Sequence, residues 1–305
     1  MTDVNELRAQ LRRRLAEPRL LSVPGVYDMI SARIADAAGF DALYMTGYGT
    51  VASHLGLPDA GLASYAEMVG RVEVIAGGVS APLIADGDTG FGGLLNLERT
   101  IRGYERAGAA AIQLEDQEFP KKCGHTPGRR VIPLEDAVRK IRVAVDSRDS
   151  ADFLIVARTD ARTAHGLDEA LRRADAFARA GADILFVESP ESEAEMERIC
   201  RAFDLPLLAN MVEGGRTPVL PASRLQEMGY RVALFPSLGF LSAGRALADA
   251  YAMLKAEGSS AGYVDRVYDF DRFSRLMGFE AVWDFEQRWN EADAPRQAAG
   301  GRLQP

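Results

Sequence analysis

Short apolar runs rich in Val, Ile and Leu alternate along the chain with longer stretches of helical period. Eight of these runs have the length and composition of buried strands. They lie at residues 20–25, 42–47, 82–88, 110–116, 153–160, 184–189, 206–211 and 232–237. Because the runs are almost continuously apolar, they predict a parallel sheet covered by helices.

The stretches between the runs predict the covering helices. Two examples, residues 96–109 and 167–182, contain Gly108 and Gly181 where a helix would take a C-terminal cap. No glycine-rich dinucleotide fingerprint follows the first run, which favours a closed (β/α)8 barrel of the TIM type over a doubly wound sheet.

The barrel interpretation also predicts the domain organisation. A chain of 305 residues is compatible with one domain or two. Aromatic helical stretches follow the eighth run, so we expect a single domain over residues 1–290, with extra C-terminal helices. The polar tail, residues 291–305, is expected to be disordered.

Charge and composition exclude several classes of function. The formal net charge of −8, without a basic stripe, argues against nucleic-acid binding. No apolar run reaches the ~18 residues of a membrane span, and the N-terminus reads as a polar helix instead of a signal peptide. We therefore expect no membrane partner and a cytoplasmic protein. With two cysteines in the chain, a disulfide framework is not expected.

Polar residues gather where the predicted strands end, which is where barrel active sites lie. They are Asp86, Asp88, Glu115, Asp116, Arg158, Asp160, Glu188 and Asn210. So many carboxylates would repel one another without a cation, and their oxygens favour Mg²⁺ or Mn²⁺ over zinc. In an extended "DGD", Asp86 and Asp88 would face the same side. Asp116, Asp160 and Ser189 could instead be helix caps or turn residues.

One long connection follows the fourth run. Residues 117–133, here called the cysteine loop, have neither helical nor strand pattern and contain "FPKKCGHTPG". Connections this long inside a compact domain are often functional. The loop would bring Lys121, Cys123 and His125 over an anionic substrate, with the thiol as nucleophile or general acid. The simpler alternative is a solvated basic loop.

Several motifs in order resemble one known family. "GDTGFGG", "LEDQ", "KKCGH", "ARTDAR" and "NMVEGGRTP" are similar to the isocitrate lyase and phosphoenolpyruvate mutase superfamily, over residues 23–248. The stretch "TGYGTVASHLGLPDAGLASYAEMV" is most similar to the branch that contains 2,3-dimethylmalate lyase, 2-methylisocitrate lyase and the petal death protein.

The resemblance implies roles for particular residues. Asp88 would bind Mg²⁺ directly, while Asp59, Asp86 and Glu115 would hold its water ligands. The remaining site residues implied are those of the substrate carboxylate pocket (Tyr44, Thr46, Gly47, Tyr48), the carbonyl-binding Arg158, the far wall (Glu188, Asn210) and the cysteine loop (Lys121, Cys123, His125).

It also implies a reaction and an assembly. The chemistry would be Mg²⁺-dependent cleavage of a substituted 2-hydroxy dicarboxylate into an α-keto acid and a carboxylate, through an enediolate that Cys123 protonates. The base would be Tyr44 or a metal-bound water. The last helix would pack on a neighbouring subunit of a homotetramer.

Substrate choice stays open at this stage. Pro236 near the end of the eighth strand is typical of the lyases, although Ser237 follows it directly. An oxaloacetate hydrolase or decarboxylase, a carboxyphosphonoenolpyruvate mutase and a non-catalytic dicarboxylate-binding barrel are the alternatives. Pocket size is expected to depend on Phe186, Met211, Val212, Phe235 and Leu238, and a methylated malate is the first substrate hypothesis.

Overall fold

The computed structural model describes residues 3–126 and 128–293 and contains a closed barrel of eight parallel strands in the order β1 to β8. The strands are β1 (Leu21–Val26), β2 (Leu43–Met45), β3 (Leu83–Asp86), β4 (Ala111–Glu115), β5 (Leu154–Thr159), β6 (Ile184–Val187), β7 (Leu207–Asn210) and β8 (Val232–Phe235). Each lies within or beside one of the apolar runs. The (β/α)8 prediction is therefore confirmed.

Alternation along each strand divides the apolar side chains between the barrel interior and the helical layer. Tyr44, Ile84 and Phe186 belong to an inner cluster made of strand residues and two leucines of α1 (Val4–Ala16). Their neighbours Leu43 and Leu83 pack outward against helices instead. Because both faces are buried, the strands carry the continuous apolar pattern seen in the sequence.

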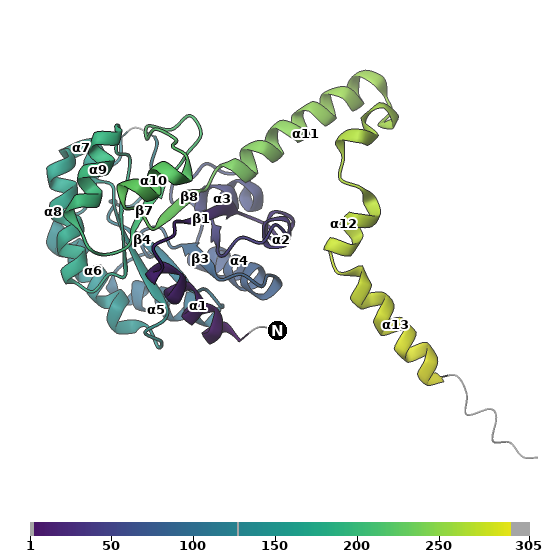
Figure 1. Ribbon diagram of the computed structural model, residues 1–305, viewed down its shortest axis with the longest axis horizontal. Helices are drawn as coiled ribbons and strands as arrows, with labels where there is room; N and C mark the ends of the chain where they lie inside the picture. The colour runs from purple at the N-terminus through teal and green to yellow at the C-terminus, as the bar shows by residue number, and fades with distance from the viewer. Residues whose placement is uncertain (1–2, 127, 294–305) are drawn as a thin grey trace, which may run out of the picture. The chain divides into compact units, whose positions relative to one another are not determined.

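Helices follow the strands and surround the barrel (Figure 1). They are α2 (Met29–Ala37), α3 (Gly47–Leu55), α4 (Tyr65–Gly78), α5 (Leu94–Arg106), α6 (Leu134–Ser147), α7 (Ala161–His165), α8 (Leu167–Arg179), α9 (Glu193–Ala202) and α10 (Ala222–Met228). Gly108 and Gly181, just after α5 and α8, have φ of 97° and 100°. Both glycines therefore end their helices in the left-handed conformation, as predicted.

The strands other than β1 end earlier than the sequence predicts. β3 stops at Asp86, and Asp88 has a φ of 48°. Ser189, placed at the end of the sixth predicted strand, has a φ of 60°. The argument that Asp86 and Asp88 share one side of an extended segment was therefore wrong. A turn brings them together instead, since the Asp88 amide donates to Asp86 Oδ1 at 3.2 Å.

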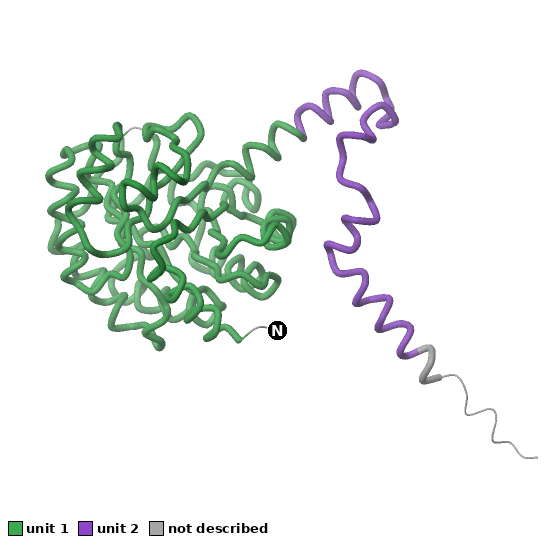
Figure 2. Tube along the Cα trace, viewed as in Figure 1, with its two compact units in different colours: residues 1–246 green, residues 247–305 purple. Residues whose placement is uncertain are grey.

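Contacts divide the chain into two compact units, residues 1–246 and 247–305 (Figure 2). The first holds the barrel. Helix α11 (Leu238–Glu257) begins in the first unit and ends in the second, which continues with η1 (Ala261–Arg266), α12 (Phe270–Leu276) and α13 (Phe279–Asp293). A single domain over residues 1–290 stays a prediction.

Two predictions concern the end of the chain and the membrane. Residues 291–293 of the tail expected to be disordered are helical, as the end of α13, and the rest of the tail lies outside the described residues. Among the described helices, none combines the length and the apolar character that a membrane span requires.

Candidate active site

A pocket opens at the carboxyl ends of the strands, with about 530 Å³ of empty space that is partly open to solvent. The predicted site residues that line it are Tyr44, Thr46, Tyr48, Asp59, Asp86, Glu115, Lys121, Cys123, His125, Arg158, Asn210 and Pro236. The other three predicted residues, Gly47, Asp88 and Glu188, contact this lining without belonging to it. The structure thus brings together the whole predicted set.

Asp86 is held in place on the acidic side of the pocket. Its Oδ2 accepts from the Gly47 amide at 3.2 Å, and its Oδ1 accepts from Gln113 Nε2 at 3.3 Å. A Cβ on residue 47 would lie 2.5 Å from Asp86 Oδ2, so only glycine allows this approach. The start of α3 therefore packs directly onto the carboxylate.

Lys121 reaches from the cysteine loop into the carboxylates. Its Nζ forms ion pairs with Asp59 and, at 2.6 Å, with Asp88 Oδ1. Burial lowers the pKa of Lys121, but Asp88 and Asp59 outweigh burial and hold it well above its usual value. Lysine thus stays charged and neutralises part of the acidic cluster.

The carboxylates still carry more buried negative charge than the protein compensates. Burial raises the pKa of Asp88 to about 6 despite Lys121, and it raises the pKa of Glu115 well above its usual range. Glu115 Oε1 is buried without a hydrogen-bond partner. A divalent cation with water ligands would balance the excess negative charge and give Glu115 Oε1 a hydrogen-bond partner. The donor set therefore fits Mg²⁺. No group of three His, Cys, Asp or Glu side chains among the described residues is arranged to chelate one ion directly.

The cysteine loop lies against the mouth of the barrel. The Cys123 amide donates to the Asp59 carbonyl at 3.1 Å, and Ser189 Oγ donates to the Gly124 carbonyl at 3.1 Å. Burial raises the pKa of the Cys123 thiol, which therefore keeps its proton at neutral pH. This arrangement excludes the alternative of a solvated loop for Lys121 and Cys123.

His125 is oriented by three groups. The Arg216 amide donates to its Nδ1 at 3.2 Å, its Nε2 lies 3.1 Å from Glu188 Oε1, and Asn210 Nδ2 lies 3.4 Å from Nε2. The accepting Nδ1 leaves a proton on Nε2, which donates to Glu188. The ring is thus fixed at the pocket wall as a hydrogen-bond donor.

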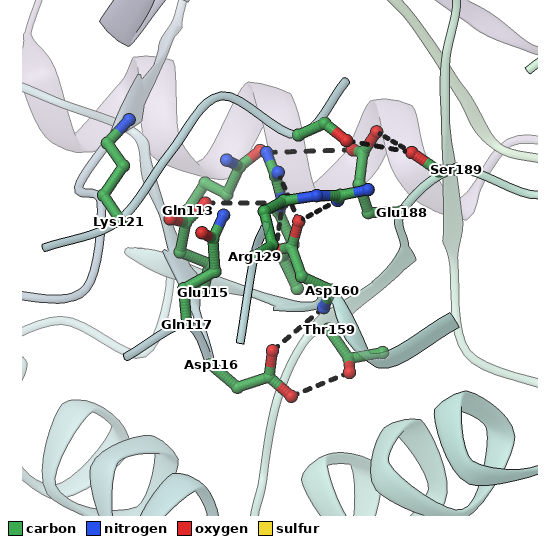
Figure 3. A network of polar contacts seen from close by, with 12 residues as sticks. Gln113, Glu115, Asp116, Gln117, Lys121, Arg129, Thr159, Asp160, Glu188 and Ser189 are labelled. Atoms are coloured by element: carbon green, nitrogen blue, oxygen red, sulfur yellow. Dashed lines mark hydrogen bonds and ion pairs between the residues drawn. The ribbon is translucent and has the colours of Figure 1, made fainter. Parts of the chain in front are cut away.

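Arg158 belongs to a buried polar network. Figure 3 shows other members of this network, among them Arg129, Asp160 and Glu188. Arg158 Nε and Nη2 donate to the two oxygens of Asp160 at 2.8 and 2.9 Å, and Glu115 and Glu188 lie within 3.4 and 3.7 Å. Burial would lower the pKa of Arg158, but these carboxylates raise it well above its usual value. Arg158 is therefore a fixed cation facing the pocket.

Apolar side chains, here called the apolar arc, form the rest of the pocket wall, and the Arg158 guanidinium lies 5.1 Å from the centre of the Phe186 ring. The arc consists of Tyr48, Phe186, Val212, Leu234, Pro236 and Phe240. The rings of Tyr48 and Phe240 are 5.3 Å apart. Ser237 also lines the pocket, but its Oγ donates to Glu213 Oε2 at 2.6 Å.

Comparisons with known proteins agree with this geometry. The family model described as phosphoenolpyruvate phosphomutase matches residues 11–255. The chain belongs to the phosphoenolpyruvate phosphomutase and isocitrate lyase superfamily. The resemblance found in the sequence motifs is thereby confirmed.

Named relatives of this superfamily cover nearly the whole chain. The 2,3-dimethylmalate lyase of Eubacterium barkeri is 48% identical over 92% of this chain and 97% of its own. The 2-methylisocitrate lyase of Aeropyrum pernix is 41% identical over 94% of this chain and 91% of its own.

Solved structures of the superfamily have the same fold. An oxaloacetate acetylhydrolase bound to 3,3-difluorooxalacetate superposes with a TM-score of 0.88 at 33% identity, covering 93% of this chain and 97% of the other. A phosphonopyruvate hydrolase in complex with oxalate and Mg²⁺ has a TM-score of 0.84 at 27% identity, covering 93% and 99%.

The sequence left Asp116 and Asp160 open between a cap or turn role and a role at the barrel mouth, and it did not predict Gln113. Asp160 stands at the N-cap position of α7, yet its side chain makes no capping bond and binds Arg158 and Arg129 instead. Asp116 accepts from Thr159 Oγ1 and from the Asp160 amide at 2.7 and 2.9 Å. In the sequence, an aspartate that caps a helix cannot be distinguished from one that binds buried arginines. Gln113 did leave a signal, as an amide inside the apolar fourth run.

The prediction of pocket size was partly wrong. Phe186 and Val212 line the pocket, whereas Met211, Phe235 and Leu238 do not. Phe235 packs outward against the helical layer, while Leu234 before it faces inward. A one-residue difference in strand register therefore exchanges which side chain meets the substrate.

Proposed function

We propose that this protein is a carbon–carbon lyase that cleaves a substituted 2-hydroxy dicarboxylate into an α-keto acid and a carboxylate. The observation that carries the proposal is the position of Cys123 in the same pocket as the acidic cluster and Arg158, where burial raises the pKa of its thiol. A proton donor in this position suits a reaction that forms a carbanion, which must then be protonated. A protein that only binds its ligand does not need such a donor.

Mg²⁺ is the cation that fits the acidic side, and Mn²⁺ would be held by the same oxygens. Asp88 would hold it directly, with Asp59, Asp86 and Glu115 binding its water ligands. When bound, the ion would acidify the substrate hydroxyl and neutralise the adjoining carboxylate. The phosphonopyruvate hydrolase solved with Mg²⁺ supports this choice.

The chain's own side chains would carry the remaining steps. Thr46, the Gly47 amide region and Tyr48 would receive the carboxylate next to the hydroxyl, and Arg158 would bind the oxygen that becomes the keto group. The base would be Tyr44 or a metal-bound water, and burial raises the pKa of Tyr44 well above its usual value, which favours the water.

After the C2–C3 bond breaks, negative charge moves onto the second carboxylate. Lys121 would stabilise that charge as a preorganised donor. His125 lines the same pocket, with its Nε2–H directed at Glu188. Glu188 fixes His125, and Asn210 donates to Glu188 at 3.1 Å. The Cys123 thiol would then give its proton to C3, while the loop keeps bulk water from doing so.

The pocket wall favours a small alkylated dicarboxylate. The six side chains of the apolar arc include no cation that could pair with a third carboxylate. A 2,3-dimethylmalate-like substrate would place its methyl groups there, whereas the additional carboxylate of 2-methylisocitrate would be desolvated without a partner. Ser237 is engaged by Glu213, which disfavours hydrolysis of oxaloacetate.

We further propose a cytoplasmic homotetramer in which the last helix packs on a neighbouring subunit.

A product assay tests the function. Purified protein with Mg²⁺ is mixed with 2,3-dimethylmalate, 2-methylisocitrate, isocitrate, citramalate or oxaloacetate, and products are identified by NMR. Pyruvate plus the matching carboxylate from dimethylmalate is the expected result. Oxalate plus acetate from oxaloacetate would instead establish a hydrolase, the alternative that the oxaloacetate acetylhydrolase structure raises.

A further inference from the structure

Arg129 lies at the far end of the cysteine loop from Lys121 and is buried, although the loop has no regular structure. Its guanidinium donates from Nη1 to Asp160 Oδ1 and from Nη2 to Thr163 Oγ1, both at 2.6 Å. Asp160 directly follows β5, and Thr163 lies in α7. Figure 3 shows Arg129 beside Asp160. One side chain thus fastens the loop to the barrel at two points.

The base of the loop is closed by backbone contacts. Gln117 and Val131 form an antiparallel bridge, and the Glu118 amide donates to the Arg130 carbonyl at 2.8 Å. These contacts hold the two ends of the loop together. They do not bind the loop to β5 or α7, so that attachment depends on side chains such as Arg129.

Asp160 is shared by two arginines. Its Oδ1 accepts from Arg129 and, at 2.9 Å, from Arg158, and its Oδ2 accepts from Arg158 alone. All three side chains are nearly inaccessible, with 2%, 9% and 0% exposure for Arg129, Arg158 and Asp160. Charges interact strongly in such a buried, low-dielectric site. Because the negative charge of Asp160 is shared between Arg129 and Arg158, it neutralises Arg158 less than it would if Arg129 were absent.

We propose that Arg129 is a positioning residue that couples the seating of the cysteine loop to the charge and orientation of Arg158. With the loop seated, Arg129 binds Asp160, Cys123 is shielded, and Arg158 keeps charge for an anionic ligand. When the ion pair between Arg129 and Asp160 is broken, the loop leaves the mouth more often and Asp160 neutralises Arg158 alone. The role of Arg158 rests on the proposed function, whereas the shielding of Cys123 does not.

The test compares Arg129→Met with Arg130→Met in the full-length protein. Arg130 is the adjacent residue of the same charge, but it is exposed and pairs with Glu118 at the surface. Iodoacetamide labelling of Cys123 is followed by mass spectrometry, with Cys200 of α9 as the internal reference. Calorimetry with oxalate and Mg²⁺ reports the anion site. Thr163→Val, which keeps every charge, is the second variant.

We expect Arg129→Met to raise the Cys123 labelling rate at least about tenfold and to weaken oxalate binding about tenfold, as for a broken buried ion pair. Arg130→Met should change neither, and Thr163→Val should give a smaller rise in labelling. A lower melting temperature with unchanged labelling would mean a merely structural role and would overturn the proposal. Faster labelling with unchanged oxalate affinity would overturn the coupling to Arg158. The labelling result stands even if no malate is cleaved.

Discussion

The thiol of Cys123 illustrates how surroundings select among the chemistries open to one side chain. The loop residues by themselves left the roles of nucleophile and general acid open, and the family resemblance implied the general acid. In the structure burial, together with the carboxylates of Asp59 and Glu188, raises the pKa of this thiol, while the backbone at His125 and Arg158 lower it less. At neutral pH a thiol of this kind is a poor nucleophile, and it keeps a proton that it can donate.

Replacing Cys123 by Ser should lower kcat by roughly 100- to 10,000-fold, because a hydroxyl is a far weaker acid at nearly the same position. Mg²⁺ and oxalate affinities measured by calorimetry should stay close to those of the wild type. Cys200→Ser is the control, since that thiol packs against the outer helical layer. Wild-type turnover in Cys123→Ser would remove the general-acid role.

The pH dependence of Cys123 labelling follows from the same shift. Iodoacetamide reacts with the thiolate, so a pKa above the ordinary 9.0 keeps labelling slow at neutral pH and lets the rate keep rising beyond pH 9. The measurement uses metal-free protein and locates the label by mass spectrometry. A midpoint below pH 7 would indicate a nucleophilic thiolate instead.

At the scale of single residues, the sequence predicted which polar side chains gather at the mouth of the barrel, but not the contacts that surround them. Asp86, Glu115 and Arg158 were found because each is a polar residue at the carboxyl end of a strand. Arg129 left no signal, since one buried arginine in an irregular loop looks like its exposed neighbour Arg130. Contacts between residues far apart in sequence decide that difference.

Among the elements, the turn between β3 and α5 receives unusual support from helices. Tyr104 Oη donates to the Asp86 carbonyl at 3.0 Å, Thr100 Oγ1 to the Gly90 carbonyl at 3.2 Å, and Lys140 Nζ to the Thr89 carbonyl at 2.8 Å. The turn contains Asp88 with its positive φ, a conformation that costs on the order of 1–3 kcal/mol in a non-glycine residue. The helical layer therefore maintains the backbone shape that presents Asp88.

Lys140→Met should weaken Mn²⁺ or Mg²⁺ binding about tenfold, because the Thr89 carbonyl loses its charged donor and the turn relaxes. Metal titration by calorimetry without substrate measures the effect. Arg142→Met, an exposed position on the same helix, is the matched control. Equal metal affinity in the Lys140 and Arg142 variants would show that the turn holds its shape without Lys140.

The ends of the elements were less predictable than their existence. Apolar runs identify strands through burial on both faces, but the last one or two residues of most runs lie beyond the end of the strand. The turn after β3 depends on contacts such as that between Lys140 and Thr89, which no local pattern contains. The strands were thus predicted correctly, while the geometry of "DGD" was not.

For the whole molecule, the eightfold repeat and the absence of a dinucleotide fingerprint were enough to predict the closed barrel. The arrangement of the terminal helices could not be predicted from periodicity, because their apolar positions do not say what covers them. On α13, Val282, Trp283, Phe285 and Trp289 are between 46% and 60% exposed. Apolar surface of this kind marks an interaction site.

Light scattering after size exclusion should give the mass of four chains of 33.1 kDa each. Trp283→Arg together with Phe285→Arg should yield smaller species, since a charge would be buried without a partner in any interface formed there. Asp284→Arg, between the two positions, controls for added charge. A monomeric wild-type protein would contradict the tetramer.

The apolar arc comes mainly from β6, β8, α11 and the segments after β7 and β8, with Tyr48 from α3, whereas the acidic cluster and the cysteine loop come from residues 59–133. Most of the apolar side chains that would contact the substrate side group therefore lie in a different part of the chain from the carboxylates and Cys123. A few substitutions at Val212, Leu234 or Phe240 could retune the accepted side group while the proton donor and the carboxylates remain untouched. Such modularity would let one ancestral catalyst diversify into many, and it gives protein engineers a short, well-separated set of positions to vary.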